Sequence, residues 1–326
     1  MHDFTILVLE DAHPTSVAAT HDILVAAGVL AARTAATAPR WRLCSIDGGQ
    51  VRLQGGFSIE TARLPARSRQ DRSTWVLPGL GHATPAALQA RLEHADAIGT
   101  IGAIARHAKQ GGRVAASCSS VFLLMAAGLL DGRRATTTWW LAPLLKQMAP
   151  GCMVDADRMV CVDGPIVTAG AAFAQTDLML HLLRECCGSA LVDAVSRSLL
   201  IDGRPAQAPF IVAEQQAGGN ALVARIATRI ESALPHPPTV FELAQEFGMS
   251  ERTLSRHLHR ATGKSTAALV QGIRLRRARI LLETSRMTVE QVAEAVGYGD
   301  ATALRRLMKK TTGANPSRYR PVVAAG

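Results

Sequence analysis

Apolar residues follow two different spacings along the first two hundred positions. Short runs of β-branched or other apolar residues occur at 4–9, 41–46, 75–79, 113–117, 159–162 and 165–170. Longer stretches with apolar residues at helical spacing lie between them, at 17–34, 84–109, 119–129 and 173–187. Strands that alternate with helices predict an α/β sandwich whose parallel sheet is covered on both faces. The Gly- and Arg-rich stretch 48–73 is predicted to add edge hairpins and loops.

A different pattern begins near residue 220, after which apolar residues keep helical spacing. Thr239 followed by Glu242 forms a capping box that starts a helix. Gly248 suits the left-handed position of a tight turn, and Ser250 suits the cap of the next helix, 251–260. A helix, a short glycine-containing turn and a second helix make the helix-turn-helix pattern.

This helix-turn-helix pattern occurs twice. The segment 243–263 is echoed at 292–313 with one inserted residue, and a long helix predicted at 266–283 joins the two copies. A repeat could serve packing alone, but two tandem copies on one helix are far more specific than a single match. The sequence therefore predicts an all-α domain with two helix-turn-helix motifs.

Charge separates the two parts of the chain. We expect an α/β domain at 1–200, a linker rich in Gly, Pro, Ala and Gln at 201–219, and the all-α domain at 220–326. This last part holds 17 Lys and Arg against 8 Asp and Glu, so it carries +9 of the net charge of +10. Such asymmetry indicates a module that binds a polyanion, joined to an electrostatically ordinary domain.

Composition excludes several classes of protein. Hydrophobic residues at 48% and charged residues at 19% are sufficient for a sizeable core, which excludes general disorder. No run reaches about 18 uninterrupted apolar residues, and no basic stretch precedes the first apolar one, so we expect neither a membrane span nor a signal peptide. The six cysteines show no metal-binding spacing, and we expect reduced thiols in a cytoplasmic protein without metal or cofactor.

Candidate chemistry in the first domain lies at two strand ends. The Gly-rich turn at 77–81 follows one strand, and its backbone N–H groups could face an anion. At 112–121 a strand of small residues turns sharply into a helix and places Cys118 on the turn, as in a nucleophile elbow. We expect this thiol to be lifted toward solvent, with a helix N-terminus that lowers its pKa. The alternative is a small buried thiol at a tight turn.

Residues 4–198 resemble the PfpI-like branch of the class I glutamine amidotransferase-like fold, a flavodoxin-like architecture. The resemblance is carried by the turn at 77–81, the elbow at 115–120, the specific tract AGLLDGRRATT at 127–137, and residues 167–170 and 177–180. Enzymes of this fold pair the elbow cysteine with a histidine, often assisted by a strand-end glutamate, and the resemblance places that histidine at Thr138. Because a threonine hydroxyl cannot act as a base near neutral pH, we interpret the domain as a catalytically degenerate sensor of a small molecule.

The residues that we expect to line a ligand pocket surround the two turns. They are Glu10, His13, Gly79, Leu80, His82, Cys118, Ser119 and Thr138. Glu10 ends the first strand, and either His13 or His82 could replace the missing base. Under that alternative the protein is an amidase or hydrolase that depends on Cys118 and is tethered to DNA. A third interpretation is a regulator without a ligand, whose first domain only dimerises.

Residues 220–320 resemble the AraC/XylS DNA-binding domain, including its closing pattern at 312–320. Together with the first domain, the arrangement resembles the GlxA-type regulators of that family. The resemblance implies a transcriptional regulator that binds double-stranded promoter DNA, with a small nitrogenous or amino-acid-derived effector and RNA polymerase as a further partner. We expect a homodimer, because such regulators contact repeated half-sites.

Two helix-turn-helix motifs on one helix can place their second helices in successive major-groove segments, about 34 Å apart. The residues predicted to contact bases are Arg252, Thr253, Ser255, Arg256, His259, Asp300, Thr302, Arg305 and Arg306. Arg252 and Arg256 are the leading candidates, since a guanidinium can donate hydrogen bonds to guanine O6 and N7 at the same time. Asp300 is better suited to cap its helix. The residues predicted to neutralise phosphates are Lys264, Lys309, Lys310, Arg318 and Arg320.

Overall fold

The computed structural model describes residues 3–65, 71–82, 84–201, 221–262, 265–312 and 315–319. The chain divides into two compact units, residues 1–204 and residues 205–326. Each unit has hydrophobic cores of its own. Apart from Ile201, the linker predicted at 201–219 lies outside the described residues.

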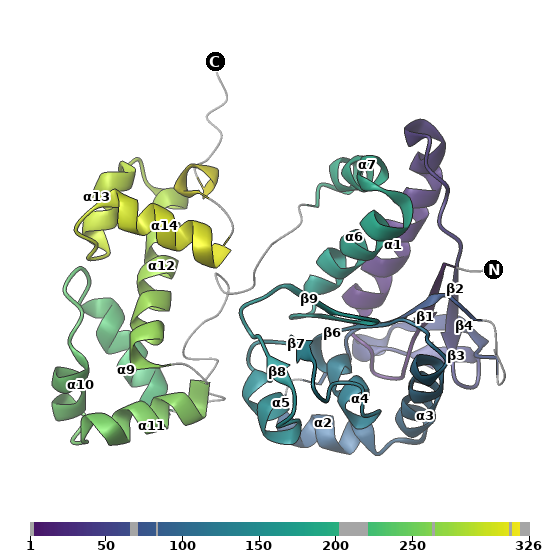
Figure 1. Ribbon diagram of the computed structural model, residues 1–326, viewed down its shortest axis with the longest axis horizontal. Helices are drawn as coiled ribbons and strands as arrows, with labels where there is room; N and C mark the ends of the chain where they lie inside the picture. The colour runs from purple at the N-terminus through teal and green to yellow at the C-terminus, as the bar shows by residue number, and fades with distance from the viewer. Residues whose placement is uncertain are drawn as a thin grey trace. The chain divides into compact units, whose positions relative to one another are not determined.

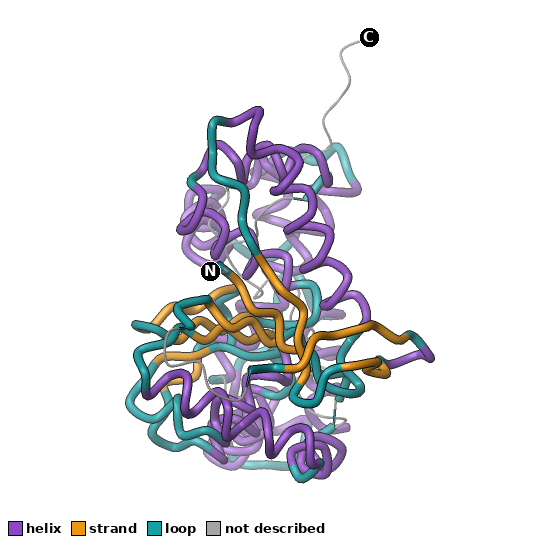
Figure 2. Tube along the Cα trace, turned by 90° about the vertical axis from the view of Figure 1, so that its right-hand side faces the viewer, coloured by secondary structure: helices purple, strands orange, loops and turns teal. Residues whose placement is uncertain are grey.

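An eight-stranded sheet forms the centre of the first unit (Figures 1 and 2). From one edge to the other, its strands are β3 (Gly49–Arg52), β4 (Ser58–Arg63), β2 (Trp41–Ser45), β1 (Phe4–Leu7), β5 (Thr74–Leu77), β6 (Val114–Ser117), β10 (Ile166–Ala169) and β9 (Val160–Asp163). The inner neighbours pair in parallel, whereas the β3–β4 and β9–β10 hairpins pair antiparallel at the two edges. The predicted parallel sheet is confirmed, with an antiparallel hairpin at each edge.

Helices cover both faces of this sheet (Figure 1). One face carries α1 (Pro14–Leu30), α6 (Ala174–Cys187) and α7 (Ser189–Leu199); the other carries α2 (Pro85–Leu92), α3 (Ala95–Lys109), α4 (Val121–Ala126) and α5 (Ala142–Met148). Successive side chains of β1 point to opposite faces, so Phe4 and Ile6 enter the core that includes α1, and Leu7 enters the core that includes α3 and α4. Apolar side chains that alternate along the strand thus contribute to the helix-covered core on each face of the sheet.

The stretch predicted as one helix at 84–109 is two helices, α2 and α3. The break lies at His94, whose backbone is extended, with φ −67° and ψ 148°. The buried guanidinium of Arg91 bridges the break to the carboxylate of Asp96 at 2.5 Å. Helices α5 and α7 were not predicted either, nor was the short parallel pair β7 (Arg134–Ala135) and β8 (Met153–Val154).

A buried carboxylate organises one end of the sheet in the first unit. The carboxylate of Asp71 accepts hydrogen bonds from the Ser73 hydroxyl at 2.6 Å and the Trp75 indole N–H at 3.0 Å, and it pairs with Arg42 at 2.6 Å. Burial by itself raises the pKa of Asp71, but these hydrogen bonds and the Arg42 charge outweigh burial and lower the pKa below its ordinary value.

The segment Pro14–Thr34, which comprises α1 and the following 3-10 turn η1 (Ala31–Thr34), is long and apolar enough to cross a membrane by length and composition alone. In the fold, Val17, Leu24 and Ala27 on one side of this segment are buried in the core shared with α6 and α7. A core helix passes the same test of length and composition without spanning a membrane.

The second unit consists of helices around two separate cores. They are α9 (Ala221–Ser232), α10 (Val240–Glu246), α11 (Glu251–Thr262), α12 (Thr266–Thr284), α13 (Val289–Ala295) and α14 (Ala301–Thr312), followed by the 3-10 turn η5 (Pro316–Tyr319). The first half of α12 contributes Leu269 and Ile273 to the core around α9, α10 and α11. Its second half contributes Ala278 and Leu282 to the core around α13 and α14. The two predicted helix-turn-helix motifs are therefore α10–α11 and α13–α14, joined by α12.

The two motifs also contact each other through the loop that follows α9. Gly297, in the turn of the second motif, has a φ of +81°, and a Cβ at this position would overlap the carbonyl oxygen of Pro235. Arg276 of α12 pairs with Glu231 of α9 at 2.5 Å. These contacts hold the second motif against the first one.

Candidate functional site and DNA interface

Cys118 lies at the carboxyl end of β6, where the chain turns through the 3-10 segment η3 (Cys118–Ser120) into α4. Its φ is +56°, in the left-handed region that residues other than glycine rarely adopt. The backbone N–H of Cys118 donates to the carbonyl oxygen of Gly170, after the end of β10, at 2.7 Å. The turn therefore has the geometry of a nucleophile elbow, held by the neighbouring strand.

The turn that follows β5 packs directly on this elbow. A Cβ on Gly79 would lie 2.8 Å from the Cβ of Cys118, so only glycine fits there. The same point lies 3.5 Å from the hydroxyl of Ser16 in α1, and Ser119 donates its hydroxyl hydrogen to the carbonyl of Leu80. The two strand ends that the sequence singled out are thus in contact. Ser16 is an additional site residue, which no local pattern could reveal because only the fold brings α1 to this turn.

Thr138 lies beside the elbow thiol. Its Oγ1 is 3.3 Å from the Sγ of Cys118, and Thr138 is fully buried. The neighbouring Thr137 donates its hydroxyl hydrogen to the carbonyl oxygen of Cys118 at 2.7 Å. Thr138 therefore occupies a position from which a base could take the thiol proton, and a threonine hydroxyl cannot do so near neutral pH.

The environment of Cys118 corrects one expectation from the sequence. The residue is only 7% exposed, and burial raises the pKa of its thiol, which the hydrogen bonds with Thr138 and Ser119 offset only in part. The expectation of a thiol lifted toward solvent with a lowered pKa was wrong. Loss of water disfavours the thiolate more than the start of a short helix favours it.

The remaining pocket candidates divide into two groups. His13 and His82 flank the elbow turns. The backbone N–H of His13 donates to the carbonyl oxygen of Gly79 at 2.7 Å, and burial lowers the pKa of His82, whose Nε2 lies 3.9 Å from the carboxylate of Asp11. Glu10 is exposed, whereas the thiol is buried and its hydrogen-bond partners are Thr138 and Ser119. Within the described residues, the thiol forms hydrogen bonds with hydroxyl groups and with neither histidine, and no group of three or more metal-ligating side chains occurs.

In the second unit, the second helices of the two motifs correspond residue by residue. Ser250 caps α11 and Asp300 caps α14, each accepting the backbone N–H three positions later. Leu254 and Leu304 are fully buried four positions after these caps. The two helices therefore align at an offset of 50 residues, which makes their exposed faces directly comparable.

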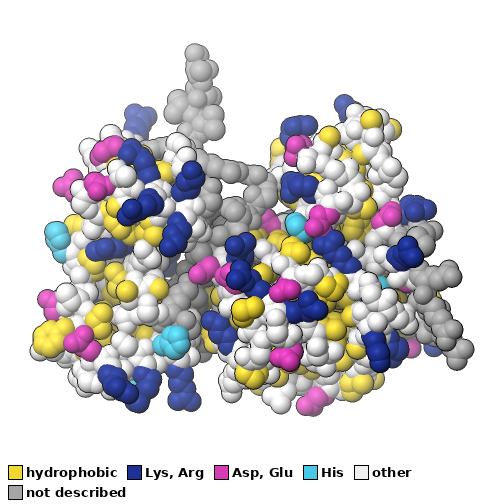
Figure 3. All heavy atoms as spheres, viewed as in Figure 1, with side chains coloured by type: hydrophobic (Ala, Val, Ile, Leu, Met, Phe, Trp, Pro, Cys, Tyr) yellow, Lys and Arg dark blue, Asp and Glu magenta, His cyan; other side chains and the backbone are white. Residues whose placement is uncertain are grey.

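At this offset Arg256 corresponds to Arg306, and both are exposed. The exposed residues Arg252 and His259 correspond to the exposed Thr302 and Lys309. Figure 3 shows Lys and Arg side chains gathered over α14 and at the end of the unit that carries α11. Each motif thus presents an exposed arginine at the same place on its second helix.

Other predicted base contacts are engaged within the protein. Arg305 pairs with Glu290 of α13 at 2.7 Å. Ser255, its counterpart in α11, is half-buried, and its hydroxyl lies 3.4 Å from that of Thr266. The hydroxyl of Thr253 lies 2.9 Å from the capping hydroxyl of Ser250, and Asp300 caps its helix, as its residue type suggested.

The predicted phosphate contacts are only partly described. Lys309 and Lys310 are exposed at the end of α14. Lys264 and Arg320 lie outside the described residues, and so does the side chain of Arg318.

Comparison with known proteins matches both units. Residues 243–321 match a helix-turn-helix domain, and residues 42–185 match the DJ-1/PfpI family. The HTH-type transcriptional regulator GlxA of Rhizobium meliloti is 30% identical over 308 residues, which cover 91% of this chain and 90% of that protein. The chain belongs to the AraC family of transcriptional regulators. Within this AraC-family protein, the second unit is the DNA-binding domain and the first is a DJ-1/PfpI domain.

Two further similarities agree with this assignment. The HTH-type transcriptional regulator CdhR of Pseudomonas aeruginosa is 29% identical over 291 residues, 87% of this chain and 82% of that protein. A solved ThiJ/PfpI family protein from Pseudomonas syringae gives a TM-score of 0.51 at 15% identity, over 83% of this chain and 91% of its own, which shows the fold alone. Both named relatives are transcriptional regulators.

Proposed function

We propose that the DJ-1/PfpI domain of this AraC-family protein senses a small metabolite without catalysing a reaction, and that the bound metabolite controls DNA binding by a homodimer. The observation that carries the proposal is the contact between Thr138 and the buried thiol of Cys118. A neutral thiol beside hydroxyl groups offers hydrogen bonds but no general base. Such a site suits recognition of a polar molecule rather than attack on it.

The class of effector comes from the family resemblance, which favours a small nitrogenous or amino-acid-derived metabolite. The hydroxyl oxygens of Ser16, Ser119 and Thr138 near the elbow can accept hydrogen bonds from such a molecule, whereas the hydroxyl hydrogens of Ser16 and Ser119 are donated to the carbonyl oxygens of Ala172 and Leu80. To act as an effector, the metabolite must bind more tightly to one of two conformations, the one that can bind DNA or the one that cannot. We expect the regulator to act in the cytoplasm and to affect transcription together with RNA polymerase.

We further propose that Arg256 and Arg306 contact base edges in successive major-groove segments. They occupy corresponding exposed positions on α11 and α14, and a guanidinium matches guanine O6 and N7. Arg252 adds a second candidate base contact in the first motif, and Lys309 and Lys310 suit phosphate neutralisation. Arg305 contributes less, because Glu290 holds its guanidinium.

Isothermal titration of the full chain with a panel of small nitrogenous and amino-acid-derived metabolites tests the sensing proposal. At least one metabolite should bind, and Thr138→Val should weaken its binding because the variant removes a hydroxyl at nearly constant volume. The exposed Thr37→Val serves as the matched control and should bind like the wild type. Binding that is indifferent to Thr138→Val, or no binding across the panel, would contradict sensing at the elbow while leaving DNA recognition untouched.

The alternative of a Cys118-dependent hydrolase makes a separate prediction. An electrophilic amide analogue should label Cys118 at neutral pH, and Cys118→Ser should abolish both labelling and turnover. The raised pKa of this thiol and the identity of Thr138 argue for the opposite result.

A further inference from the structure

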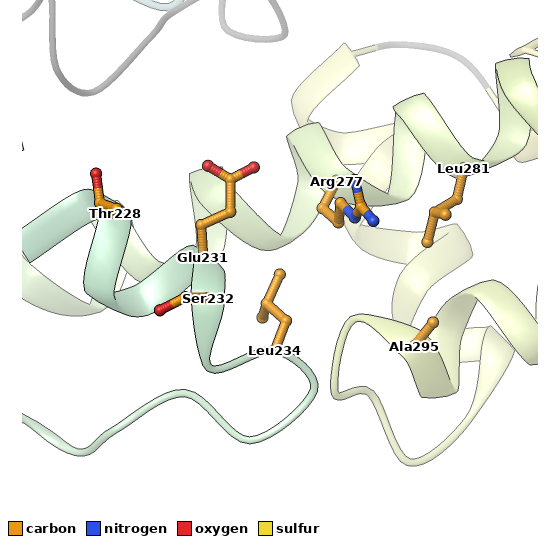
Figure 4. A pocket seen from close by; sticks show the side chains of 7 residues that line it. All are labelled: Thr228, Glu231, Ser232, Leu234, Arg277, Leu281 and Ala295. Carbon is orange, nitrogen blue, oxygen red and sulfur yellow. The ribbon is translucent and has the colours of Figure 1, made fainter.

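A groove of the DNA-binding domain opens between α9, α12 and α13 (Figure 4). Its volume is about 570 Å³, within the range of pockets that hold small molecules. The side chains that line it include Glu231, Ser232, Leu234, Arg277, Leu281 and Ala295. They come from α9 and its following loop, from α12 and from α13, so the groove touches the second motif through α13 and, on its other side, α9 and the loop that leads into the first motif.

The charges in this groove do not cancel. Glu231 is already paired with Arg276 at 2.5 Å, which neutralises the acidic side of the groove. Arg277 is exposed, and among the described residues it has no acidic partner. Figure 4 shows the Arg277 side chain on α12, across the opening from Glu231. One guanidinium is therefore left without a counter-charge at the edge of a preformed pocket.

The remaining lining is suited to an apolar body of limited size. Leu234, Leu281 and Ala295 are half-buried and form the apolar part of the groove beside Arg277. A nucleic-acid backbone would leave these side chains without an apolar partner, and an organic cation would be repelled by Arg277. A guanidinium forms its strongest and best-oriented hydrogen bonds with a planar carboxylate.

We propose that this groove binds a small organic carboxylate, whose carboxylate pairs with Arg277 and whose apolar body packs on Leu281 and Ala295. A molecule in this position contacts α9 and the loop that leads into the first motif, and it contacts α13 of the second motif. The loop already carries the close contact between Pro235 and Gly297 that holds the motifs together. Occupancy therefore acts on the relative position of α11 and α14, independently of any ligand at the elbow of the first unit.

The full chain is titrated with 4-phenylbutyrate, with the uncharged 4-phenylbutyramide as the matched probe. The carboxylate should bind, and Arg277→Gln should weaken its binding at least about tenfold, because a hydrogen bond to a charged group is lost. Ala295→Leu fills the apolar end of the groove without changing its charge, and this variant should abolish binding. Arg286→Gln, which removes an exposed charge beyond the end of α12, should bind like the wild type.

The proposal fails if the carboxylate does not bind, if its amide binds equally well, or if both Arg277→Gln and Ala295→Leu retain full affinity. Loss of binding in Thr138→Val alone would place the probe at the elbow and would also overturn the proposal. A second measurement follows affinity for a selected duplex. The carboxylate should change this affinity in the wild type and leave it unchanged in Arg277→Gln, which separates occupancy of the groove from a general salt effect.

Discussion

Alanine substitution at three glycines of the DNA-binding domain separates two contributions to its free energy of unfolding. One is the strain of a left-handed backbone conformation, and the other is the steric overlap of an added Cβ with Pro235. Gly272 lies within α12, Gly248 lies in the turn of the first motif, and Gly297 lies at the corresponding turn of the second. An added Cβ meets nothing within 4 Å at Gly272 or Gly248, whereas at Gly297 it overlaps the carbonyl oxygen of Pro235. The same chemical change therefore meets three different environments.

The expected magnitudes follow from these environments. Gly272→Ala should stabilise the domain by about 0.5–1 kcal/mol, because alanine loses less backbone entropy in a helix. Gly248→Ala should destabilise it by about 1–2 kcal/mol, because its φ of +65° is unfavourable for alanine. Gly297→Ala has a similar backbone cost at φ +81° and adds about 1–3 kcal/mol for the overlap with Pro235.

Hydrogen exchange measured by mass spectrometry on the full chain can follow each motif separately. Peptides from α13 and α14 should lose protection about thirtyfold or more in Gly297→Ala, and peptides from α10 and α11 should lose less in Gly248→Ala. All four tryptophans precede residue 141, so tryptophan fluorescence during urea unfolding reports on the first unit and should not change. Equal losses of protection in Gly297→Ala and Gly248→Ala would refute the argument that the Pro235 contact stabilises the second motif.

Arg306→Ala should weaken binding to a selected duplex by about 1–3 kcal/mol and relax the preference at one base pair, whereas Arg305→Ala should weaken binding less. Fluorescence anisotropy measures both affinities, and equal losses of affinity would count against Arg306 as the base contact. Asp71→Asn should remove about 1–3 kcal/mol of stability that is present above the ordinary pKa of 3.8 and is lost as the pH falls through the lowered pKa. When urea unfolding is measured between pH 3 and 7, the free energy of unfolding of Asp71→Asn should fall less steeply toward low pH than that of the wild type. An unchanged dependence on pH would contradict this linkage. Cys118 should react with iodoacetamide more slowly than Cys186, because burial raises the pKa of both thiols but only Cys186 is exposed to the reagent. Rapid labelling of Cys118 in peptide maps at neutral pH would revive the hydrolase alternative.

Much of the fold could be predicted because its causes are local. The Thr239–Glu242 capping box is present as predicted, and a second box of Thr288 and Gln291 begins α13 by the same chemistry. Each box involves residues only three positions apart, so a sequence window contains the whole interaction. The break at His94 between α2 and α3 was missed because Arg91 and Asp96, which pair across the extended backbone, are also hydrogen-bonded to the backbone of Glu10, far away in the sequence.

The elbow site was predictable only in part. The sharp turn at Cys118 and the glycine at position 79 carry local signals, and so does the tract that ends beside Thr138. The contact of Ser16 with that turn depends on how α1 packs beside the sheet, and no sequence window contains both segments. The burial that raises the pKa of Cys118 is likewise the sum of atoms from several elements.

By itself, the sequence determined the α/β layers, the duplicated helix-turn-helix motifs and the basic charge of the last third of the chain, because periodicity and caps are properties of short windows and net charge is a sum over residues. Only the tertiary structure decided that Cys118 is shielded from water, that Glu290 pairs with Arg305 but not with Arg306, and that Arg277 lines a groove with no acidic partner among the described residues. Solvation and charge pairing depend on which distant side chains meet, and folding alone brings them together.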